Sequence, residues 1–264
     1  MVTLAEFDLS GRVALVTGGG TGIGRATALL LAERGADVAI AGRRPEKLEP
    51  AAEEIRTLGR RALCVPADVR LAEQAPLLIE RVIAEFGRLD ILVNNAGGAG
   101  SHTPLARLDP ARWDRDVQLN LNAAMYLSQA ALPHLRQTRG NVVNISSMAG
   151  INGTKGVAAY SAAKAGVQML TRVSAAEWGH YGVRVNCVAP GMTATEKARE
   201  GWDKSGFDAP GVARHSFALR RYGETREVAQ MIVFFASDAA SYITGETVAV
   251  GGGVPLGGMI DTDD

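Results

Sequence analysis

Short apolar runs alternate with longer helical stretches along most of the chain, and this alternation constrains the fold more than any other feature. The runs are rich in Val, Ile, Leu and Ala without a polar residue at every second position, as strands buried on both faces require. Such alternation predicts a doubly wound α/β fold, a Rossmann-like parallel sheet with helices on both faces. The predicted strands are 13–17, 37–41, 61–65, 89–93, 141–146, 183–188 and 247–250. The predicted helices are 22–34, 45–58, 71–87, 110–136, 158–180 and 227–237.

One segment breaks this alternation. No internal repeat, flexible linker or low-complexity tract is visible, so we expect a single domain over residues 1–264. Segment 192–221, however, is long for a connection in a compact domain and holds Trp202, Phe207 and Phe217 among many charges. We interpret it as a substrate lid over the carboxyl ends of the strands, where such folds bind ligands. A surface excursion without a role is the alternative.

Composition and patterning argue against several classes of protein. The 28 Lys and Arg residues balance 28 Asp and Glu residues, whereas a nucleic-acid binder shows a basic surplus. The longest uncharged stretch, 117–135, is too polar for a membrane span, and residues 1–11 show no secretory signal. The four histidines and two cysteines lack the spacing of metal ligands. We therefore expect a cytoplasmic protein with no metal, nucleic-acid or membrane partner.

A glycine-rich loop follows the first predicted strand and opens the first predicted helix. It reads Thr-Gly-Gly-Gly-Thr-Gly-Ile-Gly over residues 17–24. Glycines let the backbone turn tightly and approach a pyrophosphate, while the helix N-terminus offers free N–H groups to the anion. The spacing is Gly-x3-Gly-x-Gly, not the commoner G-x-G-x-x-G, and a simple strand-to-helix turn is the alternative. Its position after the first strand is the context that a dinucleotide site requires.

The end of the second predicted strand indicates which dinucleotide. A cofactor with a free ribose 2′-hydroxyl requires a carboxylate there, whereas a 2′-phosphate requires arginine. Positions 41–44 contain no Asp or Glu, but they contain two arginines, Arg43 and Arg44. Because a guanidinium pairs well with phosphate oxygens, the sequence predicts NADP(H) over NAD(H). The alternative is that both arginines are solvated loop charges.

Tyr160 and Lys164 stand four residues apart at the start of a predicted helix, so they share one face. A nearby cation favours the phenolate, so we expect Lys164 to lower the pKa of Tyr160 toward neutrality. A tyrosine of that kind serves as general acid for a ketone or general base for an alcohol. Most Tyr–Lys pairs on helices are surface decoration, so the pair needs further support.

That support comes from two other motifs. Ser146 and Ser147 end a predicted strand, and Ser147 stands thirteen residues before Tyr160. Asn-Asn-Ala-Gly at 94–97 ends the fourth predicted strand. With the glycine loop and the Tyr-x3-Lys pair, these motifs resemble the short-chain dehydrogenase/reductase family in its Tyr-x3-Lys subgroup. The resemblance runs from about residue 9 to residue 253, and the chain is similar throughout to bacterial 3-oxoacyl-thioester reductases.

The resemblance implies four catalytic residues. Tyr160 would be the acid/base, and Ser147 would hold the substrate oxygen while Ser146 is structural. Lys164 would bind the nicotinamide ribose and tune Tyr160. Asn120 matches the family asparagine that anchors a water in a proton relay to the lysine, although an asparagine satisfied within its own helix is the alternative.

The resemblance also implies a set of cofactor contacts. Asp68 and Val69 look like the family pair that flanks adenine, with a helix N-cap as the alternative role for the aspartate. Thr193 and Thr195 would close on the nicotinamide carboxamide. Gly251 stands where the family commonly has aspartate, which puts a subunit contact in doubt. The implied cofactor residues are Gly18, Thr21, Gly22, Ile23, Gly24, Arg43, Arg44, Asp68, Val69, Asn95, Ala96, Gly97, Tyr160, Lys164, Pro190, Gly191, Thr193 and Thr195.

The expected activity is hydride transfer between NADP(H) and a carbonyl or secondary alcohol, with a 3-oxoacyl thioester of CoA or acyl carrier protein as first substrate class. Alternatives are a free ketone, steroid or sugar alcohol, or an enoyl or dienoyl thioester. Dienoyl reductases of the family typically lack the tyrosine that is present here as Tyr160. A non-catalytic NADP-sensing scaffold is the alternative of another class. The resemblance further implies a homotetramer that packs helices 110–136 and 158–180 across an interface.

Overall fold

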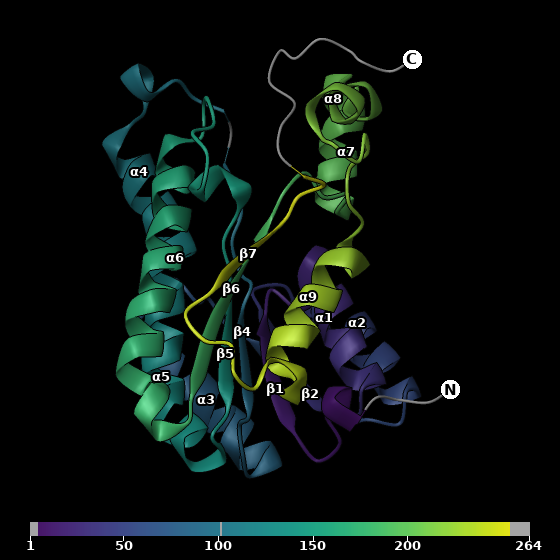
Figure 1. Cartoon of the computed structure of the whole chain (residues 1–264), viewed down its shortest axis with the longest axis vertical. Coiled ribbons are helices and arrows are strands. Elements are labelled where there is room, and N and C mark those ends of the chain that lie inside the picture. The colour runs from purple at the N-terminus through teal and green to yellow at the C-terminus, as the bar shows by residue number, and fades with distance from the viewer. Residues whose placement is uncertain (1–4, 101, 254–264) are drawn as a thin grey trace.

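A single parallel sheet organises the molecule. The computed structural model describes residues 5–100 and 102–253, and within them seven strands pair in the order β3-β2-β1-β4-β5-β6-β7. Every pairing is parallel. The predicted Rossmann-like, doubly wound sheet is therefore confirmed (Figure 1). The strands are β1 Val13–Thr17, β2 Asp37–Gly42, β3 Ala62–Pro66, β4 Ile91–Asn94, β5 Asn141–Ile145, β6 Arg184–Pro190 and β7 Thr247–Val250.

Helices cover both faces of the sheet. In Figure 1, α1, α2 and α9 lie on one side of it, and α3, α5 and α6 lie on the other. The α-helices are α1 Gly22–Glu33, α2 Pro45–Thr57, α3 Gln74–Phe86, α4 Pro110–Val117, α5 Ala123–Thr138, α6 Ala158–Trp178, α7 Glu196–Ser205, α8 Ala209–Ser216 and α9 Thr225–Ala236. Short 3-10 turns connect several of these elements.

The strands are apolar because each has two buried faces. Ala14 and Val16 of β1 belong to the hydrophobic core under α1, α2 and α9. Val13 and Leu15 of the same strand belong to the second core, under α3 and α5. Successive side chains of a strand point to opposite faces, so a strand between two helical layers needs apolar residues at every position.

The strand order reverses between β1 and β4, which are neighbours in the sheet. Ligands of such folds bind in the crevice outside the carboxyl ends of the strands at this point. Thr17, the last residue of β1, joins the two loops there. Its hydroxyl oxygen accepts hydrogen bonds from the amides of Asn95 and Ala96, each at 3.0 Å.

The helix predicted over 110–136 is interrupted. A π-helical turn, Gln118–Asn122, separates α4 from α5. Such turns add one residue to the helical repeat and often occur at functional sites. Here the turn contains Asn120, and the apolar pattern of the sequence carried no sign of the extra residue.

Segment 192–221 contains two helices that the periodicity did not predict, α7 and α8. Their start signals are nevertheless present in the sequence. The Thr195 side chain caps α7 by accepting from the Ala198 amide at 3.1 Å, and Asp208 caps α8 by accepting from the Gly211 amide at 2.9 Å. Both helices are short, and α7 carries many charges, so neither shows a clear apolar period in the sequence.

No helix among residues 5–100 and 102–253 is long and apolar enough to cross a membrane.

Candidate active site

The glycine loop lies at the carboxyl end of β1 and runs into α1. Gly18 and Gly22 have φ values of +66° and +56°, which L side chains rarely adopt. A Cβ on Gly24 would lie 2.2 Å from the carbonyl oxygen of Gly18, so the loop and the first turn of α1 touch backbone to backbone. Asn95 supports the loop from the other side, because its Nδ2 donates to the carbonyl oxygen of Thr17 at 2.8 Å.

The two candidate phosphate-binding arginines follow β2 directly. Arg43 and Arg44 are exposed, and their guanidinium groups make no hydrogen bond to the described part of the chain. Arg44 is the N-cap residue of α2, and its side chain forms no cap there. Both guanidinium groups are therefore available at the end of β2, where the 2′-position of a bound dinucleotide is read.

Asp68 lies in the loop after β3, near Arg43. Hydrogen bonds from the Arg70 guanidinium hold the pKa of Asp68 below its usual value, and the charge of Arg43 contributes in the same direction. The alternative role of Asp68 as a helix N-cap is wrong, because α3 begins only at Gln74 and the carboxylate accepts from Arg70, at 3.1 Å from its amide and 2.9 Å from its Nε. Val69, next to it, is buried.

Tyr160 and Ser147 meet at the carboxyl end of β5. Ser147 lies just beyond the strand, and Tyr160 lies in the first turn of α6. Burial raises the pKa of Tyr160 above its usual value, and a hydrogen bond with Ser147 opposes that rise. A hydroxyl pair of this kind presents two groups that can contact one substrate oxygen.

The prediction that Lys164 lowers the pKa of Tyr160 is wrong for this structure. The Lys164 Nζ lies 5.8 Å from the centre of the Tyr160 ring and donates to the carbonyl oxygen of Ile145 at 2.7 Å. Burial of the phenol is the largest influence, and it favours the neutral form. Lys164 itself is almost fully buried, which lowers its own pKa from 10.5 to about 8.

Ser146 holds Lys164 in place. Its Oγ donates to the backbone carbonyl oxygen of Lys164 at 2.7 Å and accepts from the Gln168 side chain at 2.9 Å. The structure thus gives the two neighbouring serines different environments. Ser146 is buried between β5 and α6, whereas Ser147 reaches Tyr160.

Asn120 connects the π-helical turn to the loop after β4. Its Oδ1 accepts from the Gly98 amide at 2.9 Å, and its Nδ2 donates to the Asp116 carbonyl at 2.9 Å and to the Gly98 carbonyl at 3.2 Å. The side chain is therefore bonded both within its helix and across to the loop. A Cβ on Gly97 would lie 2.7 Å from Asn120 Oδ1 and 3.1 Å from Lys164 Nζ, so these two candidates converge there.

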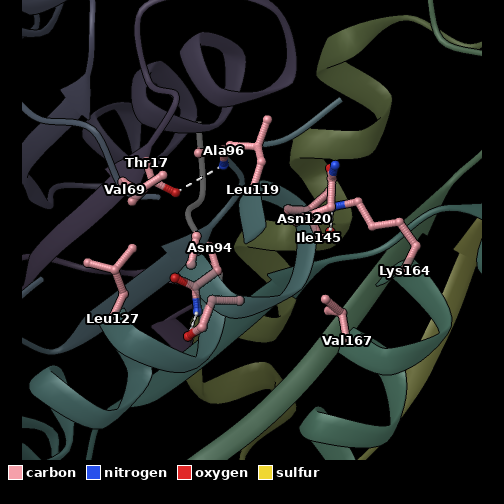
Figure 2. Close-up of a pocket in the computed structure, with 12 residues that line it drawn as sticks. Thr17, Val69, Asn94, Ala96, Leu119, Asn120, Leu127, Ile145, Lys164 and Val167 are labelled. Carbon is pink, nitrogen blue, oxygen red and sulfur yellow. Dashed lines mark hydrogen bonds between the residues drawn. The ribbon is translucent and has the colours of Figure 1, made fainter. Parts of the chain in front are cut away.

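A small cavity lies behind the site, between the loop after β4 and the first turns of α6. Figure 2 shows Lys164 extended along it toward Asn120 and Ile145. Asn94, the first residue of the Asn-Asn-Ala-Gly motif, lies on its wall. Its Nδ2 donates to Ser128 Oγ and Asn144 Oδ1, both at 2.9 Å, which ties β4 to α5 and β5.

The segment between β6 and α7, residues 191–195, is called the strap here, and its two threonines have different partners. Thr193 donates to the carbonyl oxygen of Gly191 at 3.2 Å, while Thr195 caps α7. The methyl group of Thr195 would lie 3.2 Å from a Cβ on Gly22, so the strap contacts the glycine loop. Sequence reasoning missed the next residue, Glu196, whose carboxylate accepts from the Gly22 amide at 2.9 Å.

Gly251 follows β7 against Met148. A Cβ on Gly251 would lie 1.9 Å from the Met148 sulfur, so an aspartate could not occupy this position without moving that side chain. The departure from the family pattern at Gly251 therefore has a local physical reason, because the space that a side chain needs is filled by the residue next to Ser147.

The candidate residues thus gather at one edge of the sheet. Ser147, Tyr160, Lys164 and Asn120 surround the carboxyl ends of β4 and β5. The glycine loop lies at the adjacent end of β1, and Arg43 with Asp68 lies beyond it at β2 and β3. Among the described residues no group of three or more His, Cys, Asp and Glu side chains is placed to hold a metal ion.

Comparisons with known proteins agree with this arrangement. Residues 18–255 match the family described as enoyl-(acyl carrier protein) reductase. A cis-4-hydroxycyclohexanecarboxylate dehydrogenase of Sinomonas cyclohexanicum is 43% identical over 92% of this chain and 96% of its own length. The 3-oxoacyl-(acyl-carrier-protein) reductase FabG of Thermotoga maritima is 37% identical over 94% of this chain and 99% of its own.

A solved structure extends the comparison to three dimensions. Carveol dehydrogenase from Mycobacterium avium, determined in complex with NAD, superposes with a TM-score of 0.86 at 27% identity, covering 93% of this chain and 98% of its own. Sequence and fold agree over nearly the whole length of each relative. The chain therefore belongs to the short-chain dehydrogenase/reductase family of oxidoreductases.

Proposed function

We propose that this protein transfers hydride between NADP(H) and the carbonyl carbon of a ketone, or the corresponding secondary alcohol. The observation that carries the proposal is the convergence of Ser147, Tyr160 and Lys164 beyond the carboxyl end of β5. These hydroxyls lie beside the buried ammonium of Lys164, at the strand ends where the glycine loop would hold a dinucleotide.

The raised pKa of Tyr160 suits reduction. A phenol that stays protonated at neutral pH is able to donate its proton to the substrate oxygen. Ser147 donates a hydrogen bond to the same oxygen as negative charge grows on it, and such pre-placed donors supply a large share of catalysis. The cofactor, when bound, supplies or accepts the hydride. Oxidation of an alcohol uses the same two hydroxyls in reverse.

Lys164 and Asn120 position the reacting groups. In this proposal Lys164, held by Ser146 and by the Ile145 carbonyl, presents its ammonium to the nicotinamide ribose, and Asn120 keeps the neighbouring loop in place. The glycine loop, Asp68, Val69 and the backbone at 95–97 fit the remainder of a dinucleotide, because the loop turns at positive-φ glycines and leads directly into the N-terminus of α1.

The choice of NADP(H) rests on Arg43 and Arg44. Both follow β2 without a partner that would occupy them, and no carboxylate stands at the end of that strand. One structural relative was determined in complex with NAD, so the fold itself does not require a 2′-phosphate, and we take the residues at this position to decide the preference.

A 3-oxoacyl thioester is the first proposed substrate class. It is supported by relatives named as 3-oxoacyl-(acyl-carrier-protein) reductases at 37% and 39% identity. Arg221 is not available to bind the phosphate groups of CoA or acyl carrier protein, because its guanidinium group pairs with Glu227 at 2.6 Å. Arg214, exposed on α8, is better placed to meet such groups.

A free cyclic alcohol or ketone is the second candidate. The relative at 43% identity is named for a hydroxylated cyclohexane carboxylate. Segment 192–221, which we propose as the lid, also exposes Phe207, Val212 and Leu219, side chains that suit an apolar substrate body.

We also propose that the protein forms a homotetramer through α5 and α6. Met125, Met169 and Val173 on these helices are exposed large apolar side chains, which suits burial against another copy. Light scattering measures the mass directly. A monomeric mass at micromolar concentration would contradict this assembly.

One substrate panel tests the proposed function. NADPH oxidation is followed with acetoacetyl-CoA, a longer 3-oxoacyl thioester, an enoyl and a dienoyl thioester, a steroid ketone and a cyclohexanone carboxylate, with NADH in parallel. Turnover of 3-oxoacyl thioesters supports the first class, and turnover of ring ketones alone supports the second. Tight NADPH binding without turnover of any compound would favour the non-catalytic sensor and contradict the proposal.

A further inference from the structure

The first turn of α7 places a carboxylate on the glycine loop. Glu196 Oε2 accepts a hydrogen bond from the Gly22 amide at 2.9 Å. Gly22 is the first residue of α1, so its N–H is one of the unpaired donors that a helix N-terminus presents. The contact joins residues 174 positions apart. It occupies an amide of the kind that binds phosphate at the N-terminus of a helix.

The N-terminus of α1 has no anion of its own. Thr21, its N-cap residue, forms no side-chain cap, and the first turn of α1 contains no acidic residue. Glu196 is at the same time the first residue of α7, which Thr195 caps. The carboxylate therefore lies between the positive ends of two helices, where negative charge is stabilised.

The segment before Glu196 is held to the body of the protein. The Ala194 amide donates to the Gly223 carbonyl and the Gly223 amide donates to the Met192 carbonyl, both at 2.9 Å. One turn into α7, Arg199 pairs with Glu224 at 2.8 Å. These bonds fix the start of α7, so the position of Glu196 follows from the backbone.

The same turn of α7 also reaches the loop after β4. Lys197 Nζ lies 4.0 Å from where a Cβ on Gly98 would stand, in the loop after β4. Consecutive side chains thus reach the α1 side and the β4 side of the place where the loop would bind a pyrophosphate. A dinucleotide there has to replace Glu196 at the Gly22 amide, because one N–H does not serve two anions at full strength.

We propose that Glu196 is an internal competitor for the pyrophosphate site and so sets the affinity of the protein for its dinucleotide. The inference rests on the proposed function, because it takes the loop as a dinucleotide site. Cofactor binding then breaks the Glu196–Gly22 bond and shifts the first turn of α7, which couples the proposed lid to the presence of cofactor.

Binding measurements on two neutralised variants test this. Glu196→Gln removes the charge and keeps the size, and Glu196→Ala removes the acceptor. Glu200→Gln is the matched control, because Glu200 is an exposed carboxylate on the same helix. Calorimetry measures NADPH and adenosine 2′-monophosphate, which contains the adenosine end without a pyrophosphate. We expect both Glu196 variants to bind NADPH about two- to fivefold more tightly, the range expected for an exposed anion at a helix N-terminus.

The control ligand and control variant make the outcome specific. Affinity for adenosine 2′-monophosphate should stay unchanged in every variant, and Glu200→Gln should bind NADPH as the natural protein does. Equal or weaker NADPH binding by the Glu196 variants overturns the inference, as does the same gain in Glu200→Gln. If the natural protein binds neither NADPH nor NADH, the proposed function itself fails, which is a distinguishable result.

Discussion

The amide oxygen of Asn120 and the ammonium of Lys164 approach the same α-carbon, that of Gly97. A Cβ there would lie 2.7 Å from the first atom and 3.1 Å from the second. Asn120 comes from a π-helical turn and Lys164 from α6, so a glycine in the loop after β4 is what lets two separate helices meet. The absence of a side chain at Gly97 is thus part of the site.

This convergence predicts that Gly97→Ala damages the site. The added methyl group forces Asn120 or Lys164 away, and overpacking of this kind costs about 1–3 kcal/mol of unfolding free energy. We expect kcat to fall together with stability, measured by steady-state kinetics and urea unfolding. Gly201→Ala, inside α7 with open space at its Cβ, is the control and should raise stability by about 0.4–1 kcal/mol. A Gly97→Ala variant with unchanged kcat would show that the two side chains need not meet there.

Tyr160→Phe tests the acid/base assignment. Removal of the phenolic hydroxyl should lower kcat about 100- to 10,000-fold, the usual contribution of a general acid, and leave the dissociation constant for NADPH nearly unchanged. Tyr242→Phe is the matched control, because Tyr242 is fully exposed. Substantial carbonyl reduction by Tyr160→Phe would assign proton transfer to another group.

Arg43→Glu tests the reading of the 2′-phosphate. Loss of a charge-assisted contact and gain of a repulsive charge should weaken NADPH binding about 10- to 100-fold or more and affect NADH much less. Calorimetry with both dinucleotides measures the ratio. Arg81→Glu changes the same charge at an exposed position on α3 and should leave the ratio unchanged. Equal losses for NADPH and NADH would show that Arg43 does not contact the 2′-phosphate.

The buried ammonium of Lys164 predicts a specific dependence of stability on pH. Its pKa falls from 10.5 to about 8 on folding, because burial disfavours the charged form. Below about pH 8 the ammonium is protonated in both states, so the folded protein bears the full cost of burying it. Between about pH 8 and 10.5 the unfolded chain binds more protons, so stability rises with pH through this window.

Lys164→Met isolates this contribution. At about 1.4 kcal/mol per pKa unit, the natural protein should gain about 3 kcal/mol relative to the variant between pH 7.5 and 10.5. Urea unfolding of both proteins across this range measures the difference, and groups common to both cancel. Parallel stability curves would show that Lys164 keeps an ordinary pKa in the folded protein.

The sequence by itself determined the fold class and the places where the site had to be sought. Strands buried on both faces require continuous apolar runs, so the alternation predicted the sheet, and the glycine loop, Arg43, Ser147 and the Tyr160–Lys164 pair follow strand ends or start helices. These signals are local, because the hydrophobic period and the residues that start or end an element lie within a short stretch of sequence. The Thr195 cap that starts α7 is a local signal of the same kind.

Only the tertiary structure decided how these residues act on one another. The pKa of Tyr160 rises because burial by distant segments outweighs the charge four residues away, which inverts the expectation from helix spacing. The convergence of Asn120 and Lys164 on Gly97, and the contact of Glu196 with Gly22, join parts of the chain that share no local pattern. Burial and long-range hydrogen bonds depend on which surfaces pack together, so they are settled only when the helices meet the carboxyl edge of the sheet.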